Sequence, residues 1–128
     1  MEGVNVMIVD DSIIMIKNLT TMLKELGHNV VCTCKNGQTA VLGYGKHNPD
    51  IVTMDITMPD MNGIEATKKI VQTFPDAAII MITSHGQEAM VLESIQAGAK
   101  GYILKPLNSE KLKEAIEKVL AKSKKISS

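Results

Sequence analysis

Five apolar runs of strand length recur along the chain at regular intervals, and segments with helical periodicity separate them. The runs occupy residues 4–9, 29–33, 50–54, 77–82 and 101–105. The first, third and fourth are almost uniformly apolar, which is typical of parallel strands that helices cover on both faces. Because short connections link each strand to the next helix, this order predicts an α/β fold with a doubly wound, five-stranded parallel sheet.

Helices are expected at residues 16–26, 37–47, 63–74, 87–97 and 112–120. Gly27 provides a stop signal after the first of them, and Ser109 is in position to cap the last. Gly43 and Gly45 lower the helix propensity of the second. No linker, repeat or low-complexity segment interrupts the pattern. Residues 1–128 are therefore interpreted as a single domain, with a core at about 4–121 and a polar tail at 122–128.

The charge balance and the apolar runs exclude several classes of partner. The chain carries 14 basic and 14 acidic residues, so its formal net charge is zero. We expect no direct nucleic-acid partner, because the domain has no excess positive charge to attract the phosphate backbone. No apolar run approaches the roughly 18 residues of a membrane-spanning helix, so no membrane insertion is expected. There is no signal region at the start, and Cys32 and Cys34 are interpreted as reduced packing residues, so the expected location is the cytoplasm.

Four of the five predicted strands end in an ionisable or hydroxyl side chain. Asp10 and Asp11 follow the first run, Asp55 the third, Thr83 the fourth and Lys105 the fifth. In an open doubly wound sheet, ligands bind beyond the carboxyl ends of the strands. If the first, third, fourth and fifth strands are neighbours, three carboxylates, a hydroxyl and an ammonium meet at one edge of the sheet.

The electrostatics of such a cluster restrict its use. Two carboxylates about 4 Å apart repel by roughly 4 kcal/mol at an effective dielectric near 20, so three together need a proton or a cation. Oxygen ligands without nearby His or Cys favour a hard ion such as Mg²⁺. A carboxylate can also attack phosphorus, and a lysine and a hydroxyl suit the phosphoryl oxygens. The cluster therefore favours a cation site at which phosphoryl chemistry takes place.

Taken singly, the same residues also suit structural roles. Asp11 or Ser12 could cap the first helix, and Thr83 or Ser84 could cap the fourth. Lys105 could be an ordinary solvated lysine. Because all of them fall at one edge of the predicted sheet, a shared functional site explains the pattern better than several separate structural roles.

The stretches "VDDS", "MDITMPDMNG", "ITSH" and "GYILKP", in this order, resemble the receiver domains of two-component response regulators. The resemblance spans essentially the whole chain, which is similar in form to the single-domain, CheY-like members of this family. It implies a flavodoxin-like (βα)5 fold with strand order 2-1-3-4-5. It also implies a signalling switch that accepts a phosphoryl group from a histidine kinase in a Mg²⁺-dependent reaction.

By this resemblance, Asp55 would be the phosphoacceptor. Asp11 and Asp55 would bind Mg²⁺ directly, together with the backbone carbonyl of Thr57, and Asp10 would act mainly through a metal-bound water. In this family the positions of Thr57 and His85 flank the path of the hydrolytic water. The two residues would therefore tune how long the phosphate persists.

The resemblance also implies a switch and a surface that reports its state. Lys105 would pair with Asp55 and then with the phosphoryl oxygens. Thr83 would move toward the new phosphate, and Tyr102 would swing inward behind it. The fourth helix, fifth strand and fifth helix would form the face that a partner reads, around residues 87–97, Tyr102 and residues 107–117.

Three further positions carry implications of the same resemblance. Pro106 would follow a cis peptide bond that directs Lys105 into the site, and Gly63 would let the chain turn sharply into the third helix. Leu107 departs from the chemotaxis type, which often has an aromatic residue there. The expected partners are a sensor histidine kinase or phosphotransfer protein and a downstream effector protein. The domain would be a monomer that only autophosphorylates from small donors and autodephosphorylates, rather than an enzyme.

Four alternatives remain at this stage. A phosphatase of the haloacid dehalogenase type would need a second aspartate where Thr57 stands. An interaction module that is never phosphorylated would have no need for the full set of site residues. A flavodoxin-like FMN protein is disfavoured, because no phosphate-binding loop follows the first strand. The chain could also be the receiver part of a longer DNA-binding transcriptional regulator.

Overall fold

The computed structural model of the chain describes residues 3–58, 61–84 and 86–127. Within these residues the strands are β1 (Asn5–Val9), β2 (Asn29–Cys34), β3 (Ile51–Asp55), β4 (Ile79–Thr83) and β5 (Gly101–Leu104). The helices are α1 (Ile13–Glu25), α2 (Gly37–His47), α3 (Gly63–Thr73), α4 (Glu88–Ala97) and α5 (Ser109–Ser127). Strands and helices alternate along the chain, as the sequence predicts.

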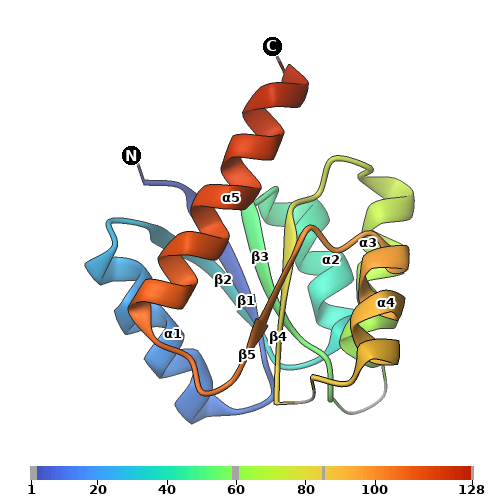
Figure 1. Cartoon of the computed structure of the whole chain (residues 1–128), viewed down its shortest axis with the longest axis horizontal. Helices are drawn as coiled ribbons and strands as arrows, with labels where there is room; N and C mark the ends of the chain where they lie inside the picture. Colours follow the sequence, from blue (N-terminus) through green and yellow to red (C-terminus); the bar gives the residue numbers. More distant parts are fainter. Residues whose placement is uncertain (1–2, 59–60, 85, 128) are drawn as a thin grey trace.

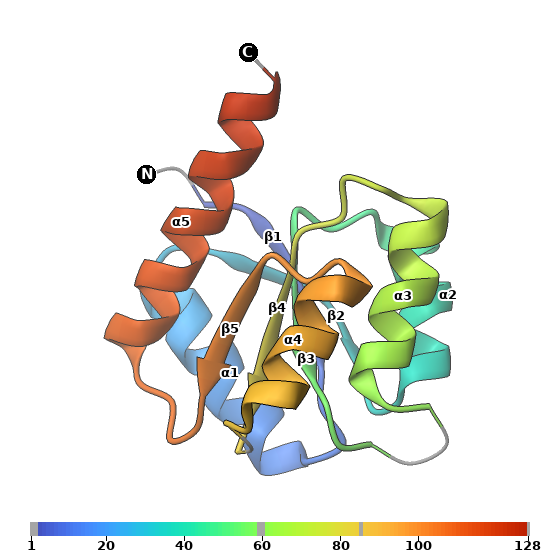
Figure 2. The same ribbon diagram turned by 45° about the vertical axis from the view of Figure 1, so that its right-hand side comes forward.

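The strands form a single parallel sheet in the order β2-β1-β3-β4-β5. Helices α1 and α5 cover one face of this sheet, and α2, α3 and α4 cover the other (Figures 1 and 2). The predicted fold class and strand order are confirmed. Because β1, β3, β4 and β5 are neighbours, the residues that follow them meet at one edge of the sheet.

The sheet separates two apolar layers. Alternate residues of a strand point to opposite faces, so Ile79 and Met81 of β4 belong to the layer under α2, α3 and α4. Ile80 and Ile82 belong to the layer under α1 and α5. All four are buried almost completely. Uniformly apolar strands are therefore required here, because each has a buried layer on both sides.

An irregularity in β2 determines which of its residues face which layer. Val6 of β1 is paired with Val30, but the next residue, Met7, is paired with Cys32, so Val31 is an extra residue in β2. Without this bulge, Val30 and Cys32 would share a face. With it, Val30 packs against the layer of α1 and α5, whereas Cys32 and Cys34 pack in the other layer. The two thiols therefore lie on the same face as Met7.

Polar side chains cap four of the five helices described. Each accepts a hydrogen bond from a backbone N–H in the first helical turn, where such donors otherwise have no partner. The caps are Ser12 for α1, Asn36 for α2, Asn62 for α3 and Asn108 for α5. The expectation that Ser109 caps the last helix is wrong. Asn108 Oδ1 accepts the Lys111 N–H at 2.8 Å, and Ser109 is already helical.

Helix α4 differs from the others at its start. It follows Gln87, whose side chain makes no capping hydrogen bond. Neither Thr83 nor Ser84 caps it, because the helix begins only at Glu88. The amino end of α4 is therefore held by backbone contacts, with Gln87 O accepting the N–H groups of Met90 and Val91 at 3.0 and 3.1 Å.

The predicted strand boundaries agree with the structure to within two residues. Helix α5 continues to Ser127, so its backbone includes most of the segment 122–128 that the sequence suggested was a polar tail. Both cysteines are free thiols, as expected. Among the described residues, no helix combines the length and apolarity that crossing a membrane requires.

Candidate functional site

The polar residues that follow four strands converge at the carboxyl edge of the sheet. Asp10 and Asp11 come directly after β1, Asp55 and Thr83 are the last residues of β3 and β4, and Lys105 follows β5. The grouping predicted from the sequence is therefore present. In Figure 1 these loops lie at the bottom of the molecule, away from the end at which β1 begins and α5 finishes.

Three carboxylates form the centre of the site. One oxygen each from Asp10, Asp11 and Asp55 lies within 4.8 Å of the others. Asp10 and Asp55 are buried, whereas Asp11 is exposed. Asp10 is fixed further by its own backbone, because its N–H donates to Cys34 O at 2.9 Å and its Oδ1 accepts the Ser12 N–H at 2.9 Å. The site therefore has two oriented, buried carboxylates and one open to solvent.

Lys105 supplies the positive charge of the site. Its Nζ lies 3.6 Å from Asp10 Oδ2 and 3.6 Å from Asp55 Oδ1. The backbone N–H of Lys105 donates to Thr83 O at 2.8 Å, which ties the residue to the end of β4. The Lys105–Pro106 peptide bond is cis, as expected. The sequence reasoning paired Lys105 with Asp55 and missed Asp10, because spacing along the chain does not show which of two aspartates faces a lysine.

The charge balance leaves an excess of negative charge around Asp55. Burial of the carboxyl and then the nearby charge of Asp10 raise the pKa of Asp55 to about 6 from its usual 3.8, against the opposing effect of Lys105. A single ammonium cannot neutralise three carboxylates. A divalent cation would offset the remainder, and it would compete with the proton for the same oxygens.

The donor set fits a hard divalent cation. It consists of carboxylate oxygens alone, and the described residues place no His or Cys side chain in this cluster. Ions such as Mg²⁺ prefer oxygen ligands and retain several waters, which a partly open site permits. Asp10, Asp11 and Asp55 are the residues that would hold such an ion.

The other predicted site residues have mixed outcomes. Thr83 is buried at the end of β4. Tyr102 is half-buried on β5 and packs against the layer of α2, α3 and α4, and this burial raises its pKa. Thr57 is exposed in the loop after β3. The prediction for His85 lies outside the described residues.

Gly63 is required at the site for a reason other than the one expected. Its backbone does not adopt the left-handed conformation that a sharp turn would need; among the described glycines only Gly27 and Gly98 do so. Instead, a Cβ atom on Gly63 would lie only 2.1 Å from the carbonyl oxygen of Asp55. The N–H of Gly63 also donates to Ile56 O at 2.8 Å. The start of α3 therefore presses directly against the backbone of Asp55.

A family model described as the response regulator receiver domain matches residues 6–117. The chain belongs to this family. Asp55 and its neighbours therefore form the acidic pocket of a receiver domain, a kind of site at which this family binds Mg²⁺.

Individual relatives resemble this receiver domain over nearly their whole length. The chemotaxis protein CheY of Thermotoga maritima is 47% identical over 117 residues, which cover 91% of this chain and 98% of that protein. CheY of Bacillus subtilis is 47% identical over 115 residues, covering 90% and 96%. Among solved structures, the CheX-CheY-BeF3-Mg complex from Borrelia burgdorferi contains a chain that superposes with a TM-score of 0.88. That chain is 41% identical, and the match covers 91% of this chain and 88% of that one.

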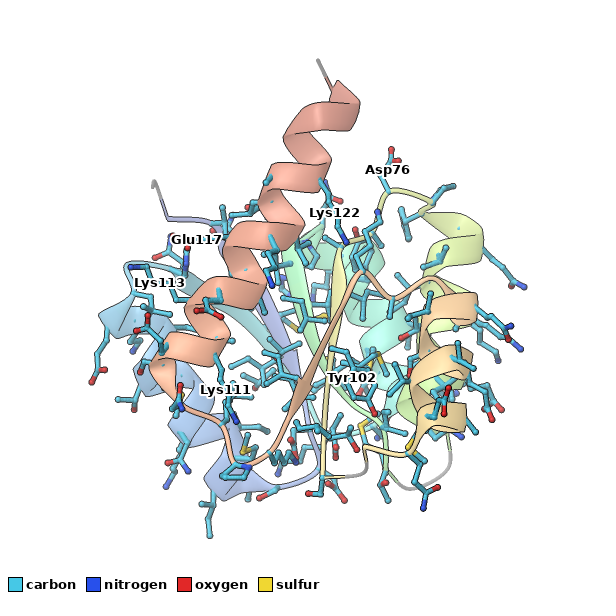
Figure 3. The ribbon with its side chains drawn as sticks, viewed as in Figure 1. Asp76, Tyr102, Lys111, Lys113, Glu117 and Lys122 are labelled. Carbon is cyan, nitrogen blue, oxygen red and sulfur yellow. The ribbon has the colours of Figure 1, made fainter. Side chains whose placement is uncertain are left out.

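The receiver domain also carries a groove of about 600 Å³ over β5, between α4 and α5. Its lining includes Val91 of α4, Tyr102 and Leu104 of β5, and Lys111 and Lys122 of α5. In Figure 3 Tyr102 lies on the α4 side of β5, whereas Lys111 lies near the start of α5 and Lys122 lies further along it. β5, which lines this groove, pairs with β4 as far as Thr83. The groove is therefore only one strand away from the end of β4.

Proposed function

We propose that the chain is a phospho-accepting switch of a two-component system, with Asp55 as the phosphoacceptor. The strongest support is the position of Asp55 at the carboxyl edge of the sheet, close to Asp10, Asp11 and Lys105. An unphosphorylated interaction module would not need three carboxylates placed so that burial, and then the charges of the neighbouring aspartates, raise the pKa of the central one. The family assignment supports the same role.

The phosphoryl transfer is a displacement at phosphorus. A carboxylate oxygen of Asp55 forms a bond to the phosphorus atom, and the bond from phosphorus to the donor atom breaks, so the donor leaves with that electron pair. The donor is the phosphohistidine of a kinase or a phosphotransfer protein, or a small acyl phosphate. Bound Mg²⁺ would neutralise charge on the phosphoryl oxygens. Hydrolysis by water later returns the carboxylate and releases inorganic phosphate.

Lys105 and Thr83 have complementary tasks in this proposal. The Lys105 ammonium, which lies 3.6 Å from Asp55 Oδ1, pairs with a phosphoryl oxygen once Asp55 is modified. The Thr83 hydroxyl approaches another phosphoryl oxygen, and the loop after β4 moves with it. Tyr102 then moves inward. In this proposal Asp11, Asp55 and the backbone carbonyl of Thr57 would hold Mg²⁺ directly, and Asp10 would act through a metal-bound water.

The output of the switch is the face formed by α4, β5 and α5. We propose that an effector protein reads this face and that the chain acts in the cytoplasm, as a monomer, in chemotaxis or a related pathway. The similarity to CheY proteins supports this placement. In this proposal the chain catalyses only its own phosphorylation from small donors and its own dephosphorylation.

The test is phosphorylation by acetyl phosphate with Mg²⁺, measured by intact mass spectrometry. The wild-type chain is expected to gain one phosphoryl group, and Asp55→Asn none. The matched control is Asp76→Asn, which removes an exposed carboxylate from the loop before β4 at the opposite end of the molecule (Figure 3). Labelling of Asp55→Asn at the wild-type stoichiometry, or equal loss in Asp76→Asn, would overturn the assignment.

Phosphate lifetime tests the second part of the proposal. If His85 and Thr57 line the approach of the hydrolytic water, His85→Ala and Thr57→Ala will each change the decay rate of the phosphorylated chain after the donor is removed. Their uptake of the phosphoryl group should remain possible. Decay at the wild-type rate in both variants would remove these residues from the mechanism.

A further inference from the structure

Three sulfur atoms gather between β1, β2 and α2, away from the carboxylate site. The bulge in β2 pairs Cys32 with Met7 and Cys34 with Val9, so both thiols and the thioether lie on one face of the sheet. The Sγ atoms of Cys32 and Cys34 are 3.6 Å apart. Helix α2 covers these sulfurs, and Gly43 is the residue of α2 that lies against them.

Gly43 shows that the three sulfurs converge. The position that a Cβ atom on Gly43 would occupy lies 3.3 Å from Cys32 Sγ, 3.4 Å from Cys34 Sγ and 3.4 Å from Met7 Sδ. Among the described residues, no atom beyond the neighbouring turns of α2 is nearer to it. The three sulfurs therefore border the position that a side chain at residue 43 would take.

The spacing of the thiols suits shared coordination. Two sulfurs that each lie about 2.3 Å from one ion, at a tetrahedral angle, are about 3.8 Å apart. The observed separation of 3.6 Å is close to this value. Thiolate and thioether ligands together suit a soft ion such as Cu(I). Structural Zn²⁺ takes four ligands from Cys, His and carboxylates, of which this cluster supplies two, and Mg²⁺ takes oxygen ligands.

We propose that Cys32, Cys34 and Met7 form a binding site for a soft, thiophilic metal ion of the Cu(I) class. An ion would enter from the β2 edge of the sheet, where Cys32 is partly exposed while Cys34 and Met7 are buried. Binding releases the two thiol protons: one monovalent cation and two thiols give a dithiolate complex of charge −1 and two protons. No electron transfer is involved.

The structure also gives the competing explanation, in which the sulfurs only pack. Cys34 Sγ contacts Thr39 O at 3.6 Å, and burial together with the contact from Cys32 raises the pKa of Cys34 to about 12. In the absence of metal, Cys34 is therefore a protonated thiol. A soft ion can displace this proton because the metal–thiolate bond is strong, whereas a packing pair would bind no ion in competition with a chelator.

The experiment titrates the full chain with Cu(I), without oxygen and in competition with a chromogenic Cu(I) chelator. Wild type is expected to withdraw one equivalent, and Cys32→Ser and Cys34→Ser are each expected to bind at least about 100-fold more weakly. Met7→Leu keeps the core volume and should bind about 10-fold more weakly. X-ray absorption at the copper edge should show three sulfur neighbours in wild type and two in Met7→Leu.

A pair of glycine variants tests the space itself without touching a thiol. Gly43→Ala places a methyl group against all three sulfurs and is expected to lose Cu(I) binding at least about 10-fold. Gly45→Ala, in the same helix, meets only the Phe74 ring at 3.7 Å and should bind as wild type does. Circular dichroism confirms that each variant is folded.

The proposal is overturned if wild type fails to compete for one equivalent, or if Cys32→Ser, at a partly exposed position, binds as tightly as wild type. Equal affinities of wild type and Met7→Leu, with two sulfurs at the copper edge, would overturn the three-sulfur site. Phosphorylation of Asp55 is measured separately with acetyl phosphate, so failure of this proposal leaves the proposed function unaffected.

Discussion

Helices α3 and α4 lie on the same face of the sheet and have similar lengths, yet the molecule holds them very differently (Figure 2). The start of α3 is fixed by Asn62, whose Oδ1 accepts the Glu65 N–H at 2.9 Å. The start of α4 has no side-chain cap. The buried residues of α3 are Gly63, Ala66, Thr67 and Ile70, whereas those of α4 are only Ser94 and Ala97.

The difference indicates which of the two helices is held less firmly. Two large apolar side chains of α4, Leu92 and Ile95, are 53% and 58% exposed, so they contribute little to its docking. An element with few buried apolar contacts and an open end is released at a low free-energy cost. Because α4 follows the loop after Thr83, we expect the proposed phosphorylation of Asp55 to repack α4 while α3 stays in place.

The most severe test of this contrast is Gly63→Ala, at the fixed start of α3. Its Cβ would lie 2.1 Å from the carbonyl oxygen of Asp55, and a backbone atom cannot yield as a flexible side chain can. We expect a loss of about 3 kcal/mol or more in the free energy of unfolding, measured in urea. The neighbouring backbone of Asp55 should be displaced as well, so phosphorylation should slow.

The control for this variant is Gly45→Ala, at an exposed position in the middle of α2. A Cβ atom there would lie 3.7 Å from the Phe74 ring, which is an ordinary contact distance. Alanine is a better helix former than glycine, so this variant should gain about 0.5–1 kcal/mol. If Gly63→Ala is as stable as wild type, the start of α3 is not fixed by its contact with Asp55 and the contrast with α4 loses its main support.

The second test removes the charge of Asp55 and leaves both helices intact. The folded-state pKa of Asp55, about 6, exceeds its usual 3.8, so between these values the folded chain binds more protons than the unfolded chain. The contribution of Asp55 to stability is therefore fully present below pH 3.8 and is lost as the pH rises through 6. At neutral pH and without metal, Asp55→Asn should be more stable than wild type by about 1–3 kcal/mol.

Urea denaturation from pH 7 to pH 4 checks this expectation. The stability advantage of Asp55→Asn should shrink as the pH falls, and Mg²⁺ should stabilise wild type at pH 7 but have a smaller effect on the variant. Asp76→Asn, with its exposed carboxylate, serves as the control. An advantage that is independent of pH would mean that the charge of Asp55 is not its cause.

The sequence predicted the site far better than it predicted the contrast between the helices. Asp10, Asp55 and Lys105 could be grouped because parallel strands deliver their carboxyl ends to one edge. The weak hold on α4 could not be predicted, since its apolar pattern resembles that of a docked helix and only the tertiary contacts show Leu92 and Ile95 to be exposed. The contact of Met7 with the two cysteines depends on the bulge at Val31. This bulge could not be predicted, because no glycine or other turn-forming residue marks it in the sequence.

The third test lowers the stability of α3 at its cap. Asn62→Ala removes the acceptor for the Glu65 N–H, so we expect a loss of about 1 kcal/mol in the free energy of unfolding. Hydrogen exchange should show faster exchange in the first turn of α3, with α4 unchanged. A loss well below this value would show that packing alone holds the start of α3.

The smallest expected effect comes from giving α4 the cap that it lacks. Gln87 already has the extended backbone of a capping residue, with φ −66° and ψ 135°, so Gln87→Ser can direct a hydroxyl oxygen at the first-turn N–H groups. We expect a gain of about 0.5 kcal/mol and slower hydrogen exchange in α4, whereas Gln87→Ala, which removes the side chain without adding an acceptor, should give neither. We expect beryllofluoride with Mg²⁺ to change hydrogen exchange in α4 of the wild-type chain, and since a tighter α4 repacks less readily, Gln87→Ser should reduce that change. If exchange in α4 is slow in wild type and insensitive to both variants, α4 is held as firmly as α3 and the switch must act through another element.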